Sequence, residues 1–203
     1  MVQINSIIVC IKQVPEITQI KIDRRSGKIR KDIPHTMHSE DKVALEVAYQ
    51  LSTKTKATIK VMSVSTEDAI PILRESYAMG AHEAYLLNDP LFDTTDGIGT
   101  AYILSKAIKK TGSYDLIITG SKSLDNYAGE VPSALSAFLG ISNVTNVISV
   151  SIENETLTVS RIADTVIEKR IVKTPAIISV RKNAVKPRLI SPLHIKRAGN
   201  YRG

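Results

Sequence analysis

Short apolar runs alternate with amphipathic segments along the chain, and this alternation predicts a sheet flanked by helices. Each run is rich in Val and Ile and is bounded by turn residues, as in buried strands. Between the runs, apolar side chains recur at helical spacing behind a capping residue. Strands are predicted at 7–11, 57–64, 84–87, 116–119 and 176–180, and helices at 39–51, 67–79, 96–110 and 130–139. The pattern indicates one α/β domain, a Rossmann-like three-layer arrangement with a mostly parallel sheet.

A different pattern follows the central part of the chain. Three strand-like runs, at 144–152, 156–162 and 166–172, are separated only by short turns and contain no helix between them. Consecutive strands joined this way pair antiparallel, so we expect an antiparallel addition to the parallel sheet. Near the N-terminus, alternating residues around Ser26-Gly27 predict a surface hairpin over 17–33.

Several residues mark the expected ends of helices. Ser39 is a favourable N-cap, and Asp68 stands at capping-box spacing from Ser65. Pro71 is compatible with a helix only near its first turn, because a later proline removes a backbone hydrogen bond. Thr95 or Asp96 suits the start of the third helix, and Gly140 suits the end of the fourth.

The segment from Asp115 to Gly140 is the strongest candidate for a binding site. A buried strand ends at Gly120 and Ser121, a polar loop runs to Gly129, and a helix begins at Glu130. In α/β sheets this order presents backbone N–H groups and a helix N-terminus to an anion such as phosphate. The loop is neither a Walker loop nor a GxGxxG motif, and most strand–loop–helix units bind nothing, so both interpretations stay open here.

Charge divides the chain into a neutral body and a basic end. The net charge is +7, and residues 181–203 contain seven Lys or Arg and no Asp or Glu. We therefore expect a domain over 1–180 and a basic tail over 181–203 that faces solvent or a partner. The tail holds one aromatic residue, Tyr201, and no nucleic-acid motif accompanies it, so nucleic-acid binding is not expected.

Location and catalytic chemistry follow from what the sequence lacks. No apolar run approaches the ~20 residues of a membrane span, and the N-terminus does not have the pattern of a signal peptide. The single cysteine, Cys10, fits a reducing, cytoplasmic setting and is expected to be buried and inert. His35 and His38 have metal-ligand spacing without a third ligand nearby, and no GxSxG elbow occurs. Neither a metal site nor a catalytic residue is predicted, and Arg161 is expected to pair with Asp164 or Glu168.

Four segments, in order and covering Ile7 to Arg197, resemble the electron transfer flavoprotein β subunit family. They are VCIKQVPEITQIKI, HTMHSEDKVALEVAYQL, the stretch from Gly120 to Gly140, and VSRIADTVIEKRIVKTPAIISV. The matching positions are Lys12, Val14, Pro15, Asp41, Ala44, Glu46, Ala48, Gly120, Asp125, Gly129, Val131, Leu135, Leu139, Gly140, Val159, Arg161, Asp164, Glu168, Pro175, Ala176, Pro187 and Arg188.

The resemblance implies a fold related to the adenine nucleotide alpha hydrolase-like domains. It also implies a flavin-carrying α-subunit partner, electron transfer without catalysis by this chain, and AMP or FAD as the cofactor, with FAD held mainly by the partner. Arg161 would lie toward the flavin at the subunit interface. By position, the cofactor-binding residues are Cys10, His38, Ser39, Glu40, Asp41, Val64, Ser65, Gly120, Ser121, Lys122, Ser123, Leu124, Asp125, Asn126, Tyr127, Ala128, Gly129, Glu130 and Val131.

The chain departs from the family pattern at the expected site. His38-Ser39 replaces Asn-Pro, and DNYAGE (125–130) replaces DGDTGQ, so a hydroxyl and an amide are lost and a carboxylate is gained. We therefore expect weak adenine-nucleotide binding, with AMP, FAD and an empty site all open.

Two further expectations concern partners. The family's C-terminal arm, which embraces the α subunit, has no counterpart before Gly203, and Val185 to Leu193 corresponds to a loop that recognises a dehydrogenase or another redox partner. The alternative is a stand-alone ATP- or AMP-binding homodimer of the universal-stress-protein kind. The motif from Arg161 to Pro175 favours the first interpretation.

Overall fold

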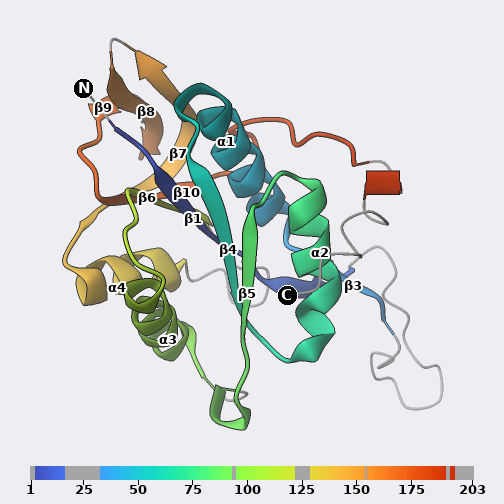
Figure 1. Ribbon diagram of the computed structural model, residues 1–203. Helices are drawn as coiled ribbons and strands as arrows, with labels where there is room; N and C mark the ends of the chain where they lie inside the picture. The colour runs from blue at the N-terminus through green and yellow to red at the C-terminus, as the bar shows by residue number, and fades with distance from the viewer. Residues whose placement is uncertain are drawn as a thin grey trace.

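The computed structural model describes residues 3–16, 33–92, 95–121, 129–153, 155–190 and 193–194 (Figure 1). The hairpin predicted over 17–33 lies outside the described residues, apart from Ile33 at its end. Within the described ranges, the chain forms one eight-stranded sheet, a separate two-stranded sheet and four α-helices.

The large sheet has the strand order β5-β4-β1-β6-β10-β7-β8-β9. Its first six strands are parallel neighbours, β8 pairs antiparallel with β7, and β9 pairs antiparallel with β8. This confirms the mostly parallel sheet with an antiparallel addition. The strands are β1 Ser6–Cys10, β4 Thr58–Val64, β5 Glu83–Leu87, β6 Leu116–Gly120, β7 Ser142–Glu153, β8 Thr156–Ala163, β9 Val166–Ile171 and β10 Ala176–Val180; β2 Gln13–Pro15 and β3 His35–Met37 pair separately.

Helices cover both faces of the parallel part and make three layers (Figure 1). The helices α1 Ser39–Thr55 and α2 Ile70–Ala78 lie on one face, and α3 Gly97–Lys110 and α4 Glu130–Leu139 lie on the other. Two single-turn 3₁₀ helices, η2 Glu67–Ala69 and η3 Pro90–Phe92, connect elements. No helix among the described residues has the length and hydropathy that crossing a bilayer requires.

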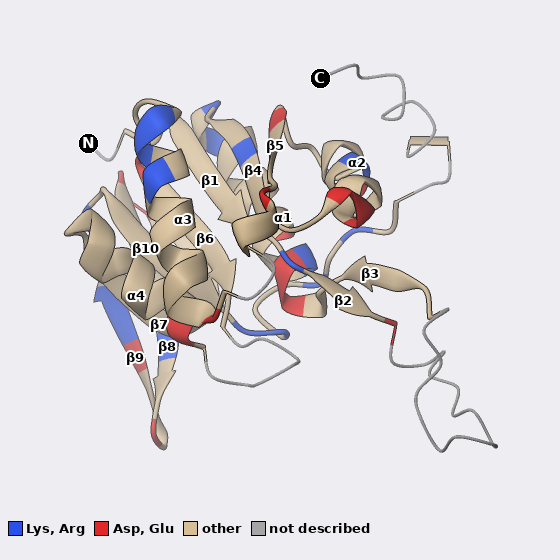
Figure 2. Cartoon of the chain, turned by 90° about the horizontal axis from the view of Figure 1, so that it is seen from below, with Lys and Arg blue, Asp and Glu red and all other residues tan. Residues whose placement is uncertain are grey.

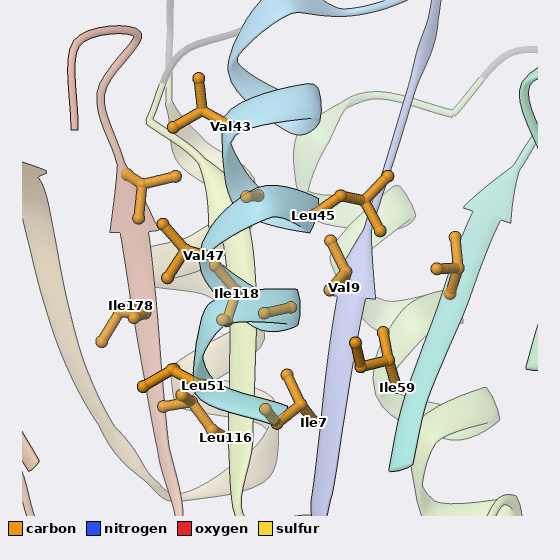
Figure 3. Packing of buried hydrophobic residues seen from close by; sticks show 14 of the residues in the cluster. Ile7, Val9, Val43, Leu45, Val47, Leu51, Ile59, Leu116, Ile118 and Ile178 are labelled. Atoms are coloured by element: carbon orange, nitrogen blue, oxygen red, sulfur yellow. The ribbon is translucent and has the colours of Figure 1, made fainter. Parts of the chain in front are cut away.

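The period-two pattern of the strands supplies both halves of the core. Ile7 and Val9 of β1 point toward α1, whereas Ile8 and Cys10 join the cluster beneath α3 and α4. Figure 3 shows α1 lying across the first face, with its apolar side chains on the central strands. Each fully buried Val, Leu or Ile stabilises the fold by about 1.5–3 kcal/mol. The contact between α1 and the central strands is therefore a main source of stability. The labelled residues there are Ile7, Val9, Val43, Leu45, Val47, Leu51, Ile59, Leu116, Ile118 and Ile178.

Most predicted helix ends are confirmed. The Asp96 side chain caps α3 by accepting the Gly99 N–H at 2.7 Å, and Gly140 ends α4 with φ 68°. Pro71 is the second residue of α2, where its missing N–H costs nothing.

Two predicted caps are wrong. The N-cap of α1 is His38, not Ser39, because the His38 N–H is held by the Lys12 carbonyl at 3.0 Å and the chain stays extended there. At Ser65, no capping box forms. The 3₁₀ turn η2 intervenes, and its N-cap Thr66 makes no side-chain cap bond.

The segment after β10 returns along α1 and is held there by an ion pair. Arg188 donates from Nε to Glu46 at 2.7 Å and from a second guanidinium nitrogen at 3.0 Å, and its guanidinium lies 3.4 Å from the centre of the Tyr49 ring. Burial alone would raise the pKa of Glu46, but the hydrogen bonds from Arg188 and Gln50 outweigh it and lower that pKa. Part of the predicted basic tail is therefore packed against the domain.

Replacing Arg188 with Leu is expected to lower the free energy of unfolding by about 3 kcal/mol at pH 7, because the buried Glu46 charge loses its partner. The lowered pKa of Glu46 means that the pair stabilises the fold above the ordinary glutamate pKa, and that this contribution is lost as the pH falls through the folded-state value. The difference in free energy of unfolding between the wild type and Arg188→Leu should accordingly become smaller below about pH 4. Urea unfolding across this pH range measures both effects.

Arg170→Leu is the matched control, because that guanidinium is half exposed on β9, where it pairs with Glu168. It should change the stability much less than Arg188→Leu does, because an exposed ion pair contributes little. Equal losses in the two variants would contradict a special role for the Arg188–Glu46 pair.

Candidate functional site

A pocket of about 200 Å³ opens at the carboxyl edge of the parallel strands. From β1 the chain proceeds outward to β4 and β5 on one side, and it later returns to place β6 and β10 on the other side of β1. The carboxyl ends of β1 and β6 are therefore the topological switch point, where doubly wound sheets hold their ligands. The pocket is lined by the ends of β1, β4 and β6 and by the starts of α1, α3 and α4.

Asp41 in the first turn of α1 holds the two strands at the switch point. Its Oδ2 accepts the Lys12 N–H at 2.7 Å, and its carboxylate also accepts the backbone N–H of Gly120. His38 Nδ1 lies 3.8 Å from Asp41 Oδ1. Burial raises the pKa of Asp41, against the lowering effect of His38 and the two backbone donors. The carboxyl is thus a structural acceptor between β1 and β6 and also part of the pocket wall.

Glu40 makes similar hydrogen bonds to the residues that follow β6 and β10. Its Oε2 accepts both the N–H and the hydroxyl of Ser121 at 2.9 Å, and its Oε1 accepts the Lys182 N–H at 3.3 Å. The Ser121 groups that the sequence offered as phosphate donors therefore contact Glu40.

The close approach of α1 requires glycine at the end of β6. A methyl group built on Gly120 would lie 2.7 Å from Asp41 Oδ1 and 3.0 Å from Glu40 Cβ. Gly129, at the start of α4, has φ 58°, and a methyl group there would lie 2.7 Å from the Ser121 carbonyl oxygen. Only glycine permits both contacts.

The inner wall of the pocket is apolar. Cys10, Met62, Val64, Leu104 and Val131 supply it from four elements, β1, β4, α3 and α4. Burial raises the pKa of Cys10 to about 12, and the nearby Asp41 charge adds to the effect, so the thiol stays protonated. Such a surface suits a flat, weakly polar ring.

The outer wall comes from the start of α3, which sequence reasoning missed. Thr95, Asp96, Gly97 and Thr100 line the pocket there. The available signal was topological: α3 follows an outer strand, so its N-terminus must lie at the same carboxyl edge as the predicted loop.

Eight of the predicted cofactor-binding residues are brought together in the lining: Cys10, His38, Asp41, Val64, Gly120, Gly129, Glu130 and Val131. Ser39, Glu40, Ser65 and Ser121 lie beside the pocket and are not among its lining residues. Lys122, Ser123, Leu124, Asp125, Asn126, Tyr127 and Ala128 lie outside the described residues. The lining also includes Ile11, Lys12, Met62, Leu104, Thr119 and Pro132 in addition to the start of α3.

The other candidates have structural partners. Arg161 donates to the Thr145 carbonyl at 3.0 Å and to Glu168 at 3.3 Å, so Glu168 is its partner rather than Asp164, which lies in the β8–β9 turn. In the part of the chain that the structure describes, no three His, Cys, Asp or Glu residues gather as metal ligands would.

Sheet order, layers and pocket together define a Rossmann-like α/β domain with a ligand pocket at its switch point. A profile of the electron transfer flavoprotein domain matches residues 28–200. The chain therefore belongs to the electron transfer flavoprotein family, and it is an electron-transfer protein of the β-subunit type.

Individual relatives agree with the family match. The chain is 37% identical over 196 residues to the electron transfer flavoprotein subunit beta of Thermoanaerobacterium thermosaccharolyticum, covering 96% of this chain and 75% of the relative. It is 34% identical over 187 residues to the subunit of the same name from Clostridium acetobutylicum, covering 92% and 72%. It is also 34% identical over 187 residues to the caffeyl-CoA reductase-Etf complex subunit CarD of Acetobacterium woodii, covering 91% of this chain and 71% of the relative.

Gly120→Ala is expected to destabilise the protein by about 3 kcal/mol, because the added methyl group must push the first turn of α1 away from β6. Thermal unfolding with far-UV circular dichroism measures this loss. Gly140→Ala serves as the control: its φ of 68° is left-handed, so the substitution strains the backbone, but no atom lies within 4 Å of the added methyl group. That variant should lose only about 1 kcal/mol from backbone strain. A Gly120→Ala protein as stable as the wild type would show that α1 is not seated on β6 as described.

Proposed function

We propose that this chain is the β-type subunit of a heterodimeric electron transfer flavoprotein and that its switch-point pocket binds the adenosine part of AMP or FAD. The observation that carries the proposal is the convergence of eight positions, selected by family resemblance, on one pocket at the expected sheet edge. The setting is proposed to be cytoplasmic, in keeping with the single cysteine of the sequence.

The chemistry of the pocket supports an adenine ring more strongly than it supports phosphate. Cys10, Val64 and Val131 offer apolar contacts, and the protonated Cys10 thiol adds no charge. The backbone at Gly120 and Gly129 comes close to the cavity because neither residue has a side chain. A planar base between the inner wall and the start of α3 would fit these features.

The flavin of a partner α subunit would carry the electrons, and this chain would supply position and electrostatics. Neither an acid–base pair nor a nucleophile is assigned to the described pocket residues: Cys10 is protonated and Asp41 is engaged by backbone N–H groups. A dehydrogenase or another redox protein is the proposed donor or acceptor. The A. woodii relative, named as a subunit of a reductase–Etf complex, supports an assembly of this kind.

Co-purification tests the subunit assignment. The tagged chain, expressed in its own host, is expected to recover an FAD-containing α-type flavoprotein, giving a yellow heterodimer with flavin absorbance. A colourless homodimer carrying ATP or AMP would instead support the universal-stress-protein alternative and would overturn the proposal.

Filling the pocket tests the nucleotide assignment. Thr100→Phe, on the pocket side of α3, should weaken adenosine and AMP binding by about tenfold or more, equivalent to about 1.4 kcal/mol. Isothermal titration of the full chain measures this. Ile98→Phe is the control on the same helix, because Ile98 is 54% exposed and is not a lining residue. Equal affinities in both variants would remove the pocket as the binding site.

A further inference from the structure

The polar side of the pocket is acidic. Its described lining includes Asp41, Asp96 and Glu130, and Lys12 is the one Lys or Arg among those described residues. Figure 2 shows acidic segments at the starts of both α1 and α4. A site built to hold a phosphate normally presents basic side chains or free N–H donors instead.

The N-termini of α3 and α4, two of the three helix starts that line the pocket, already have carboxylates of the protein beside them. Asp96 caps α3 by accepting the Gly99 N–H at 2.7 Å. Glu130 is the first residue of α4, and it reaches across to α3: a methyl group built on Gly97 would lie 3.0 Å from Glu130 Oε2. The positive ends of the two helix dipoles are therefore offset by side chains, which removes the usual reason for an anion to bind there.

Other donors at this edge that the structure describes are also engaged. The Ser121 N–H and hydroxyl bond to Glu40, and the N–H groups of Lys12 and Gly120 bond to Asp41. A phosphate beside Glu130 would meet a like charge in a partly desolvated pocket and, among the described residues, would find few backbone donors in compensation.

We infer that Glu130 is a specificity-determining residue that makes the pocket select an adenine nucleoside and disfavour its phosphate. The inference rests on the proposed function, since it concerns the ligand of the same pocket. Affinity would come from contact of the base and ribose with the apolar wall. The carboxylate of Glu130, which reaches from α4 to the start of α3, would repel a phosphate placed beside the start of α3.

The test compares adenosine with AMP on the full chain by isothermal titration at low ionic strength. The wild type should bind adenosine at least as tightly as AMP. Glu130→Gln keeps the shape and removes the charge, so it should tighten AMP about fivefold and leave adenosine unchanged. Raising the salt concentration should reduce this gain, because screening weakens a charge effect and leaves a shape effect intact.

Glu155→Gln is the matched control, since it removes the same charge from the exposed turn between β7 and β8. It should alter neither affinity. A change of less than threefold in the AMP-to-adenosine ratio of Glu130→Gln, with both ligands binding, overturns the inference and leaves the proposed pocket in place. If neither ligand binds the wild type or either variant, the proposed nucleotide site and this inference fail together. AMP binding that appears only in Glu130→Gln supports the inference.

Discussion

The structure depends on two neighbouring carboxylates at the start of α1. Asp41 accepts backbone N–H groups from the ends of β1 and β6, and Glu40 does the same for the residues that follow β6 and β10. Hydrogen bonds to a carboxylate are stronger than neutral ones, and these engage backbone N–H groups at the carboxyl ends of the strands. Because Gly120 has no side chain, the helix approaches closely enough for both carboxylates to reach. This arrangement sets the shape of the carboxyl edge and therefore the back of the pocket.

The same arrangement limits what the pocket can recognise. The described N–H groups of Ser121 and Lys12 donate to Glu40 and Asp41, and the start of α3 is occupied by Asp96 and faced by Glu130. Among the described lining residues, an apolar wall and an acidic side face the cavity. The chain thus combines the architecture of a β-type electron transfer flavoprotein subunit with a pocket whose charge disfavours the anionic part of a nucleotide.

Long-range ion pairing also determines the course of the chain after the last core strand. Arg188 pairs with Glu46 and stacks on Tyr49, so the segment leaving β10 lies along α1. The face of α1 toward the sheet is apolar, and its other contacts are polar and specific. One helix therefore organises the sheet, the pocket and the returning segment.

Local pattern in the sequence determined the elements themselves. Period-two and helical spacing located the described core strands and helices, and Asp96, Pro71 and Gly140 marked helix ends as observed. These features are decided by neighbours a few residues apart. Only the tertiary structure decided that the start of α3 forms a pocket wall, that Ser121 is bonded to Glu40, and that His38 rather than Ser39 caps α1. The physical reason is that periodicity reports which face of an element is buried, whereas these contacts join residues far apart in the chain and depend on the order of the strands.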